Sequence, residues 1–209
     1  MRLFFLITLL ACQLAQAETI ALKYEGFNIW LDCDRRAAVM YQYTATKDAG
    51  NESREHNFLH DPEVPQDCQQ KSVKSYKTSQ GKYDRGHMVP ANHFDHSKTA
   101  IKQTNYMVNI LPQAAKMNRG AFKASEMIVE CLREYADIYV LGGAVWKNDY
   151  SNDHFKESHG IETPELFWKI LIQGENVIGW IIPNKDEARY GNLDSYLASI
   201  HEIERISGV

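Results

Sequence analysis

The chain has 209 residues, is 44% hydrophobic and 24% charged, and therefore has the composition of a folded domain that buries a core without depending on disulfides. Its net charge of −4 argues against a protein whose whole surface binds nucleic acid, because such surfaces are basic. No CxxC or CxxH pair occurs, which argues against a zinc site.

Residues 1–17 have the features of a signal peptide. Arg2 supplies a short positive region, residues 3–11 are apolar but too few to span a bilayer, and residues 15–17 (AQA) form a small-x-small cleavage site. We therefore expect an exported chain, periplasmic or secreted, with a single domain at 18–209 and no stable membrane insertion. Two alternatives stay open: a buried N-terminal helix, and a lipoprotein anchored at Cys12, because residues 9–12 (LLAC) loosely resemble a lipobox.

The first half of the mature chain predicts strands at residues 27–32 and 38–46, where apolar and aromatic side chains alternate or cluster. A long polar loop follows at 47–80, and residues 83–92 are expected to be extended and irregular. Ser97 is a predicted N-cap for a short helix at 97–105. Residues 106–111 predict a strand that Pro112 stops.

The second half predicts a helix at 118–135, buried strands at 137–145 and 166–173, and a terminal amphipathic helix at 193–206. Residues 177–182 pair with the preceding strand across a Gly-Glu-Asn turn. The mixed order indicates an α+β fold with a central antiparallel sheet flanked by helices.

Three cysteines remain after signal cleavage, and they cannot all pair within one chain. Cys33 and Cys68 lie in polar, loop-like surroundings, whereas Cys131 lies in an apolar helical run. An exported protein folds in an oxidising compartment. We therefore predict a Cys33–Cys68 disulfide and a free, buried Cys131.

The positive charges gather in one part of the chain, while the acidic residues concentrate at 149–165 and 186–204. This gathering predicts a local basic face that binds phosphate, with an ordinary solvated surface as the alternative. The basic residues are Lys71, Lys74, Lys77, Lys82, Arg85, Lys98, Lys102, Lys116, Arg119 and Lys123.

An acid, a guanidinium, a glycine and an imidazole occur consecutively at residues 84–87. His87 carries the side chain whose ordinary pKa suits proton abstraction near neutral pH. Arg85 offers a rigid fork of donors for a phosphate, and Gly86 permits close approach of other groups. Asp84 is too near in sequence to oppose the histidine, so we expect it to buttress the turn.

A second polar stretch contains Asn109, Asn118 and Glu126. Asn118 and Glu126 are eight residues apart, so a continuous helix would place them on one side. An amide oxygen, water and substrate phosphate are ligands that Mg²⁺ accepts. N-capping is the competing interpretation of Asn118, since one oxygen does not easily serve both roles.

The segments DRGH at 84–87, NILPQ at 109–113 and NRGAF at 118–122, in this order, resemble the non-specific DNA/RNA endonuclease family. That family belongs to the ββα-metal, or His-Me finger, superfamily. The resemblance runs from about residue 27 to 182. It implies that the fold contains a ββα-metal motif.

The resemblance also implies roles. His87 would be the general base that activates water, and Asn118 would be the direct protein ligand of one hydrated Mg²⁺, with Mn²⁺ as a substitute. Glu126 would order the water shell of the metal, and Asn109 would support the site. The reaction would be phosphodiester hydrolysis of DNA and RNA that leaves 5′-phosphate ends.

Arg85 would contact the scissile phosphate. Arg54 matches the second site arginine of the family more weakly, by its place in a loop before an Asp-Pro pair. Binding would be mainly to the phosphate backbone, since no base-reading module is present. Further candidates carry less weight: Tyr76, Tyr83 and Phe94 as stacking residues, and His93 and His96 as surface residues or phosphate neighbours.

Three function classes remain at this point. The first is the endonuclease, for which a homodimer is left open. The second is a catalytically silent nucleic-acid-binding or adhesive protein on the same fold, against which the complete set of site residues argues. The third is a phosphodiesterase or phosphatase for small substrates, which the shape of the binding groove distinguishes from a nuclease.

Overall fold

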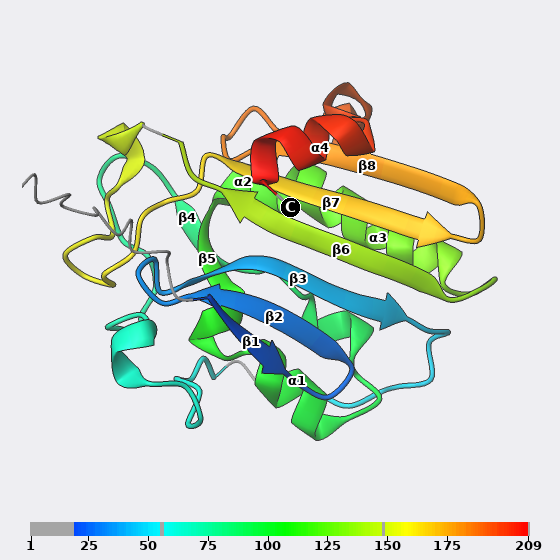
Figure 1. The fold of residues 1–209 in the computed structure, drawn as a ribbon, viewed down its shortest axis with the longest axis horizontal. Coiled ribbons are helices and arrows are strands. Elements are labelled where there is room, and N and C mark those ends of the chain that lie inside the picture. The colour runs from blue at the N-terminus through cyan, green and yellow to red at the C-terminus, as the bar shows by residue number, and fades with distance from the viewer. Residues whose placement is uncertain (1–18, 55–56, 148, 209) are drawn as a thin grey trace, which may run out of the picture.

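The computed structural model describes residues 19–54, 57–147 and 149–208. The predicted signal peptide, its cleavage site and Cys12 lie outside these residues. Six antiparallel strands form the main sheet in the order β1-β2-β3-β6-β7-β8, and a separate two-stranded sheet pairs β4 with β5 (Figure 1). The predicted α+β class, with a central antiparallel sheet flanked by helices, is confirmed.

The strands are β1 (Thr19–Lys23), β2 (Phe27–Asp32), β3 (Ala37–Ala45), β4 (Tyr83–His87), β5 (Ile110–Ala114), β6 (Ile138–Val145), β7 (Leu166–Gln173) and β8 (Asn176–Pro183). The α-helices are α1 (Lys98–Thr104), α2 (Ala115–Met117), α3 (Lys123–Leu132) and α4 (Ile200–Ser207). The remaining helical turns are η1 (Gln66–Cys68), η2 (Ala91–His93), η3 (Met107–Asn109), the wider turn η4 (Asn118–Phe122), η5 (Tyr150–Asn152) and η6 (Tyr190–Tyr196).

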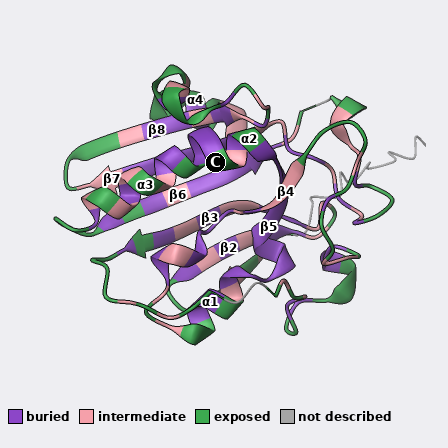
Figure 2. Ribbon diagram, turned by 180° about the vertical axis from the view of Figure 1, so that it is seen from behind, coloured by how far each residue is buried: buried purple, intermediate pink, exposed green. Residues whose placement is uncertain are grey.

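Both faces of the main sheet are covered, which explains why β7 is apolar on both sides. Phe167 and Leu171 face the larger core, which also contains Phe122 and Val129 from the η4–α3 segment. Trp168 and Ile170 of β7 pack with Ile203 of α4 on the opposite face. Figure 2 shows α3, α1 and the β4–β5 pair together on the first of these faces. The candidate site residues of β4, η4 and α3 therefore stand on the side opposite α4.

The segment after α1 differs from the prediction. It forms the short turn η3 and then strand β5, which runs through Pro112 and does not stop before it. Pro112 pairs opposite Arg85 in a sheet of two strands. Each strand of such a sheet is an edge strand, where the missing N–H of a proline is tolerated. On the open side of β5, the side chain of Asn184 accepts a hydrogen bond from the Ala114 amide at 2.7 Å.

The predicted helix at 118–135 is an interrupted helical run that starts earlier, at Ala115, and ends at Leu132. The interruption falls at Gly120, whose φ of −112° and ψ of −109° are not helical. The backbone at residues 188–190 lies against this glycine, and a Cβ there would lie 2.9 Å from the Ala188 carbonyl oxygen. A side chain at position 120 would therefore push the two segments apart.

Two terminal regions were also predicted incorrectly. Strand β1 was missed because it is only five residues long and lies directly after the predicted cleavage site; none of its side chains is buried, although it pairs with β2 along its whole length. The predicted helix at 193–206 is split into η6 and α4, because Leu197 forms a bridge with Trp180 of β8. The helix α4 then starts at a capping box made by Ser199 and Glu202.

The long loop at 47–80 contains one short helical turn, η1, within its described residues. The predicted Cys33–Cys68 disulfide is present and joins this turn to the end of β2. Cys131 is free as predicted, but it is exposed on α3 and not buried. In the part of the chain that the structure describes, no helix is both long and apolar enough to cross a bilayer.

Candidate active site

Five of the six predicted site residues line one cavity of about 500 Å³, called here the catalytic cavity. The sixth, Asn109, is buried and does not line it. The walls come from the long loop, the end of β4, the turn after it, and the η4–α3 segment. The lining residues are Arg54, Arg85, His87, Pro90, Asn92, Asn118, Arg119, Lys123, Glu126 and Glu130.

The β4–β5 pair and the helical run after it form a ββα unit that supplies this cavity. Residues 83–87, expected to be irregular, form strand β4 with a regular antiparallel register to β5. The strand ends at His87, and Asn118 opens η4 directly after α2. The unit thus brings the DRGH and NRGAF segments together: Asp84 and Asn118 are 34 residues apart in the sequence and are joined by a hydrogen bond.

Gly86 explains how the first motif fits against the second. A Cβ at this position would lie 2.1 Å from Cδ of Gln113, the buried glutamine of the NILPQ segment. The sequence predicted that Gly86 permits close approach of another group, and in the structure this group is the Gln113 side chain. Substitution of Gly86 would displace Gln113 and with it the pairing of the strand that carries His87.

His87 is held by one defined hydrogen bond. Its Nε2 lies 2.9 Å from Oδ1 of Asn105, and because an amide oxygen can only accept, Nε2 carries the proton. This leaves Nδ1 as the atom that can accept a proton. The ring also packs at 5.5 Å between centroids against Phe58.

The environment keeps His87 neutral. Burial is the largest cause that lowers the pKa of its imidazole, to about 4; the hydrogen bond to Asn105 opposes this shift, and the nearby Arg54 and Arg85 guanidinium groups add to it. An imidazole with this pKa is unprotonated at neutral pH. His87 is therefore in the form that a general base requires.

Asn109 acts beneath the chain that follows His87. Its Oδ1 accepts from the Val89 amide at 2.9 Å, and its Nδ2 donates to the Val89 and Thr104 carbonyl oxygens at 2.9 and 2.8 Å. The side chain is fully buried. Asn109 therefore joins the turn after β4 to the end of α1.

Arg85 is fixed from two sides at the mouth of the cavity. Its Nη1 donates to the Val73 carbonyl oxygen at 2.8 Å, and its guanidinium lies 3.9 Å from the centre of the Phe58 ring. Arg54 lines the same cavity from the long loop, so the weaker of the two arginine predictions is also placed at the site. Two guanidinium groups thus face the space next to His87.

Asn118 does not cap a helix, so the competing interpretation of this residue is wrong. The helical run already begins at Ala115, and Asn118 has helical dihedrals within it. Its Nδ2 donates to Oδ2 of Asp84 at 3.0 Å. Asp84 also receives two hydrogen bonds from Arg119, at 2.6 and 2.8 Å. Asp84 therefore fixes the asparagine amide rather than a turn of its own.

Glu126 lies in the first turns of α3 with an unexpected neighbour below it. Lys169 of β7 is fully buried, and its Nζ donates to Ser125 Oγ at 2.8 Å and lies 4.1 Å from the centre of the Phe122 ring. Burial raises the pKa of the Glu126 carboxyl, and the Lys169 ammonium opposes that rise. Burial lowers the pKa of Lys169 to about 8.

Several expectations for other residues are wrong. His93 is buried, with Nδ1 2.9 Å from the Tyr43 hydroxyl and Nε2 3.7 Å from Glu130. Tyr76 and Phe94 are buried in the core, so their faces are not available to stack on bases. For these three residues the surrounding polar sequence concealed an inward-facing side chain. Tyr83 is half-buried and packs edge-on against Phe155, and its stacking role stays a prediction.

Sequence reasoning also missed residues that shape the cavity. Asn105, Phe58 and Lys169 contact or support predicted site residues, and Glu130 lines the cavity and accepts a hydrogen bond from Asn92. Asn105 lies four residues before Asn109, so a second asparagine in the same stretch was a usable signal. Lys169 offered another, since a lysine inside an apolar strand needs a partner.

The donor set fits a hard divalent ion. Among the described residues, no group of three or more His, Cys, Asp or Glu side chains could hold a metal. An amide oxygen with water molecules is a sufficient shell for Mg²⁺, which keeps several of its waters. Asn118 suits this role because Asp84 holds its Nδ2 and leaves Oδ1 for the ion, and Glu126 and Glu130 supply acceptors for its waters in the same cavity.

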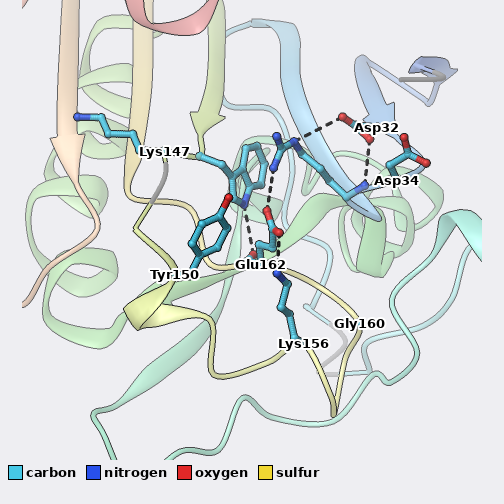
Figure 3. Close-up of a pocket in the computed structure, with 9 residues that line it drawn as sticks. Asp32, Asp34, Lys147, Tyr150, Lys156, Gly160 and Glu162 are labelled. Carbon is cyan, nitrogen blue, oxygen red and sulfur yellow. Dashed lines mark hydrogen bonds and ion pairs between the residues drawn. The ribbon is translucent and has the colours of Figure 1, made fainter. Parts of the chain in front are cut away.

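A different cavity of about 400 Å³, called here the ion-pair cavity, lies at the end of β2 (Figure 3). Glu162 lies 2.9 Å from both Arg35 and Lys156, and Arg35 also approaches Asp32 at 3.6 Å. The Arg35 guanidinium lies 5.1 Å from the centre of the Trp146 ring. These groups satisfy one another and tie the 146–162 segment to the main sheet.

Comparison with known proteins identifies the family and the fold. The family model for DNA/RNA non-specific endonucleases matches residues 10–209, and the chain belongs to that family. It is 26% identical over 212 residues to "Nuclease EXOG, mitochondrial" of Mus musculus, covering 92% of this chain and 57% of the relative. It is 26% identical over 170 residues to "Nuclease C1" of Cunninghamella echinulata var. echinulata, covering 75% of this chain and 66% of the relative.

The human protein named "Endonuclease G, mitochondrial" is 27% identical over 140 residues, which cover 61% of this chain and 47% of the relative. The chain thus spans about half the length of the mitochondrial relatives it matches. A solved structure of the EndoG/EndoGI complex superposes with a TM-score of 0.71 at 19% identity, covering 90% of this chain and 83% of that chain. This likeness establishes the shared fold.

Proposed function

We propose that this chain is an exported, Mg²⁺-dependent endonuclease that hydrolyses phosphodiester bonds in DNA and RNA. The observation that carries the proposal is one cavity lined by a neutral histidine, two arginines and an asparagine whose amide nitrogen is already bonded. The family match and the names of the relatives support the reaction class. The predicted signal peptide and the Cys33–Cys68 disulfide support export, although the animal relatives are named mitochondrial.

The residues of the chain divide the work. His87 Nδ1 accepts the proton of the attacking water, while Asn105 holds Nε2–H and so fixes the tautomer and the ring orientation. Arg85 and Arg54 bind oxygens of the scissile phosphate and stabilise the negative charge that develops on it in the transition state. Asn118 Oδ1 would hold the metal, and Glu126 would accept hydrogen bonds from the waters around it.

When bound, a divalent ion supplies Lewis-acid stabilisation of the phosphate and of the leaving oxygen. Departure of the 3′ oxygen leaves a 3′-hydroxyl on the upstream fragment and the phosphate on the 5′ end of the downstream fragment. The role of Asp84 in this scheme is to hold Asn118 and Arg119 in place.

The test is to incubate residues 18–209 with supercoiled plasmid and with RNA, in Mg²⁺ and in chelator. We expect both polymers to be cut in Mg²⁺ and neither in chelator. The new ends should accept label from a polynucleotide kinase only after phosphatase treatment, because they carry 5′-phosphates. If neither polymer is cut with any divalent metal, the proposal is wrong.

A further inference from the structure

A second cavity borders the catalytic cavity and shares Arg85 with it. Its volume is about 530 Å³, and none of its lining side chains is acidic. We call it the basic cavity. The lining residues are Ser72, Lys74, Ser75, Lys77, Arg85, Ser158 and His159. Cations with hydroxyl donors, and no carboxylate, are the groups that bind phosphate oxygens.

The segment that carries the lysines is held in place. Arg85 donates to the Val73 carbonyl oxygen at 2.8 Å, and His159 Nε2 lies 3.0 Å from the Lys74 carbonyl oxygen. Tyr76, between the two lysines, is buried and donates to Gln70 Oε1 at 2.8 Å. These hydrogen bonds hold the walls of the cavity in place, although the long loop supplies most of its lining.

The charges in this cavity are not neutralised by neighbours. Lys74 and Lys77 are exposed, and within the described ranges neither forms an ion pair. Arg119, which lines the catalytic cavity, is by contrast paired with Asp84 at 2.6 Å. Lys74 and Lys77 therefore add positive charge that no carboxylate pairs with next to the catalytic cavity.

We propose that the basic cavity binds the sugar-phosphate backbone of the nucleic-acid strand beyond the scissile phosphate. The inference rests on the proposed function and narrows its substrate to a polymer. Arg85 is the junction, since it faces both cavities, so one strand can pass from His87 to Lys77. No phenylalanine, tyrosine or tryptophan among the described residues lines the cavity, so we expect it to contact phosphates rather than bases and to add no sequence preference.

The experiment compares the double variant Lys74→Ser, Lys77→Ser with a matched control, Lys23→Ser, Lys102→Ser. The control removes the same charge from exposed lysines that line neither cavity. Activity is measured on single-stranded DNA of about 30 nucleotides and on bis(p-nitrophenyl) phosphate, a diester too small to reach the basic cavity. Arg85 is left intact, since it belongs to the proposed catalytic machinery.

We expect the KM for the polymer to rise about 10-fold or more near 0.1 M salt, with kcat within about twofold, because two phosphate contacts are lost. The slope of log KM against log salt should decrease in magnitude by about 1 to 2. Hydrolysis of the small diester should not change. The control variant should behave as the wild type on both substrates.

Three results would overturn the inference: unchanged polymer KM, an equal loss on both substrates, or the same loss in the control. A further arm measures anisotropy of a labelled oligonucleotide in chelator, and it answers the question even if the wild type cuts nothing. Absence of cleavage by the wild type would then contradict the proposed function. Weaker oligonucleotide binding by the Lys74→Ser, Lys77→Ser variant than by the wild type and the control would still support a strand-binding role for the basic cavity. Weakened binding of inorganic phosphate with unchanged oligonucleotide binding would identify a free-anion site and refute the strand path.

Discussion

The catalytic cavity and the ion-pair cavity have similar sizes and both mix cations with carboxylates, yet their charges are arranged in opposite ways. In the ion-pair cavity, Glu162 lies between Arg35 and Lys156 at 2.9 Å from each (Figure 3). In the catalytic cavity, Arg54 and Lys123 have no ion-pair partner among the described residues. Paired charges hold a loop in place, whereas unpaired charges facing one space are free to bind a ligand.

The largest expected effect comes from removing the base. His87→Ala should lower kcat on plasmid DNA by about 10²- to 10⁴-fold, because proton abstraction from water is lost. The metal concentration for half-maximal activity should stay within about twofold, since the imidazole is not in the proposed shell. Wild-type activity in this variant would remove His87 from the mechanism. Trp146→Phe, in the ion-pair cavity, is the control and should retain activity.

The next effect separates the metal position from the rest of the site. Asn118→Ala should raise the Mg²⁺ concentration for half-maximal activity by at least about 10-fold. Removal of a direct ligand should weaken metal binding at least as much as removal of a residue that only supports a ligand. Titration of activity with Mg²⁺ measures this shift. Asp84→Asn should give a smaller shift in the same direction, because the amide of Asn118 would lose its charged partner. An unchanged Mg²⁺ requirement in Asn118→Ala would contradict the assignment.

Protonation gives a third comparison. The folded pKa of His87, about 4, lies below the ordinary value of 6.5, so the unfolded chain takes up this proton first as pH falls. The contribution of His87 to the free energy of unfolding should therefore be constant above pH 6.5 and become destabilising from 6.5 towards 4. Urea unfolding at pH 7.5 and 4.5 should show a smaller loss at low pH in His87→Ala. An equal loss in both proteins would place the pKa near its ordinary value.

The same shift predicts that kcat/KM does not fall as pH decreases from 7 to 5, since the base stays neutral. Arg54→Ala removes one of the cations that lower this pKa, so the acid limb should move to higher pH. We also expect a decrease of about 10-fold in kcat/KM at pH 7, the loss of one charged contact to phosphate. A pH–rate profile with the wild-type limb would indicate that Arg54 lies too far from His87 to act on it.

The smallest effect on activity should come from the paired arginine. Arg35→Ala breaks the contacts to Glu162 and Asp32 and should lower the free energy of unfolding by roughly 0.2 to 1 kcal/mol, as expected for a partly exposed pair. Its activity should stay within about twofold of wild type. Chemical denaturation and the plasmid assay measure the two quantities. A loss of activity equal to that of Arg54→Ala would erase the distinction between the two cavities.

Local sequence was informative where one residue type has few alternatives. The histidine and arginine of DRGH and the asparagine of NRGAF line one cavity, and the predicted hairpin turn at Gly174 joins β7 to β8. The cysteine pair was recognised from its polar surroundings. Polar residues around His93, Tyr76 and Phe94 were misleading, because exposure was inferred from neighbours in sequence and burial is set by neighbours in space.

The sequence by itself determined which functional groups are present, their order, and the α+β class, because these depend on residue identity and short-range periodicity. Only the tertiary structure decided that Asn118 is not a cap, since Asp84 is 34 residues away and the helical run begins before it. It also decided the hydrogen bond of Asn105 to His87, the buried Lys169 near Glu126, and the junction of two cavities at Arg85. Each of these depends on contacts between distant segments, which local sequence does not encode.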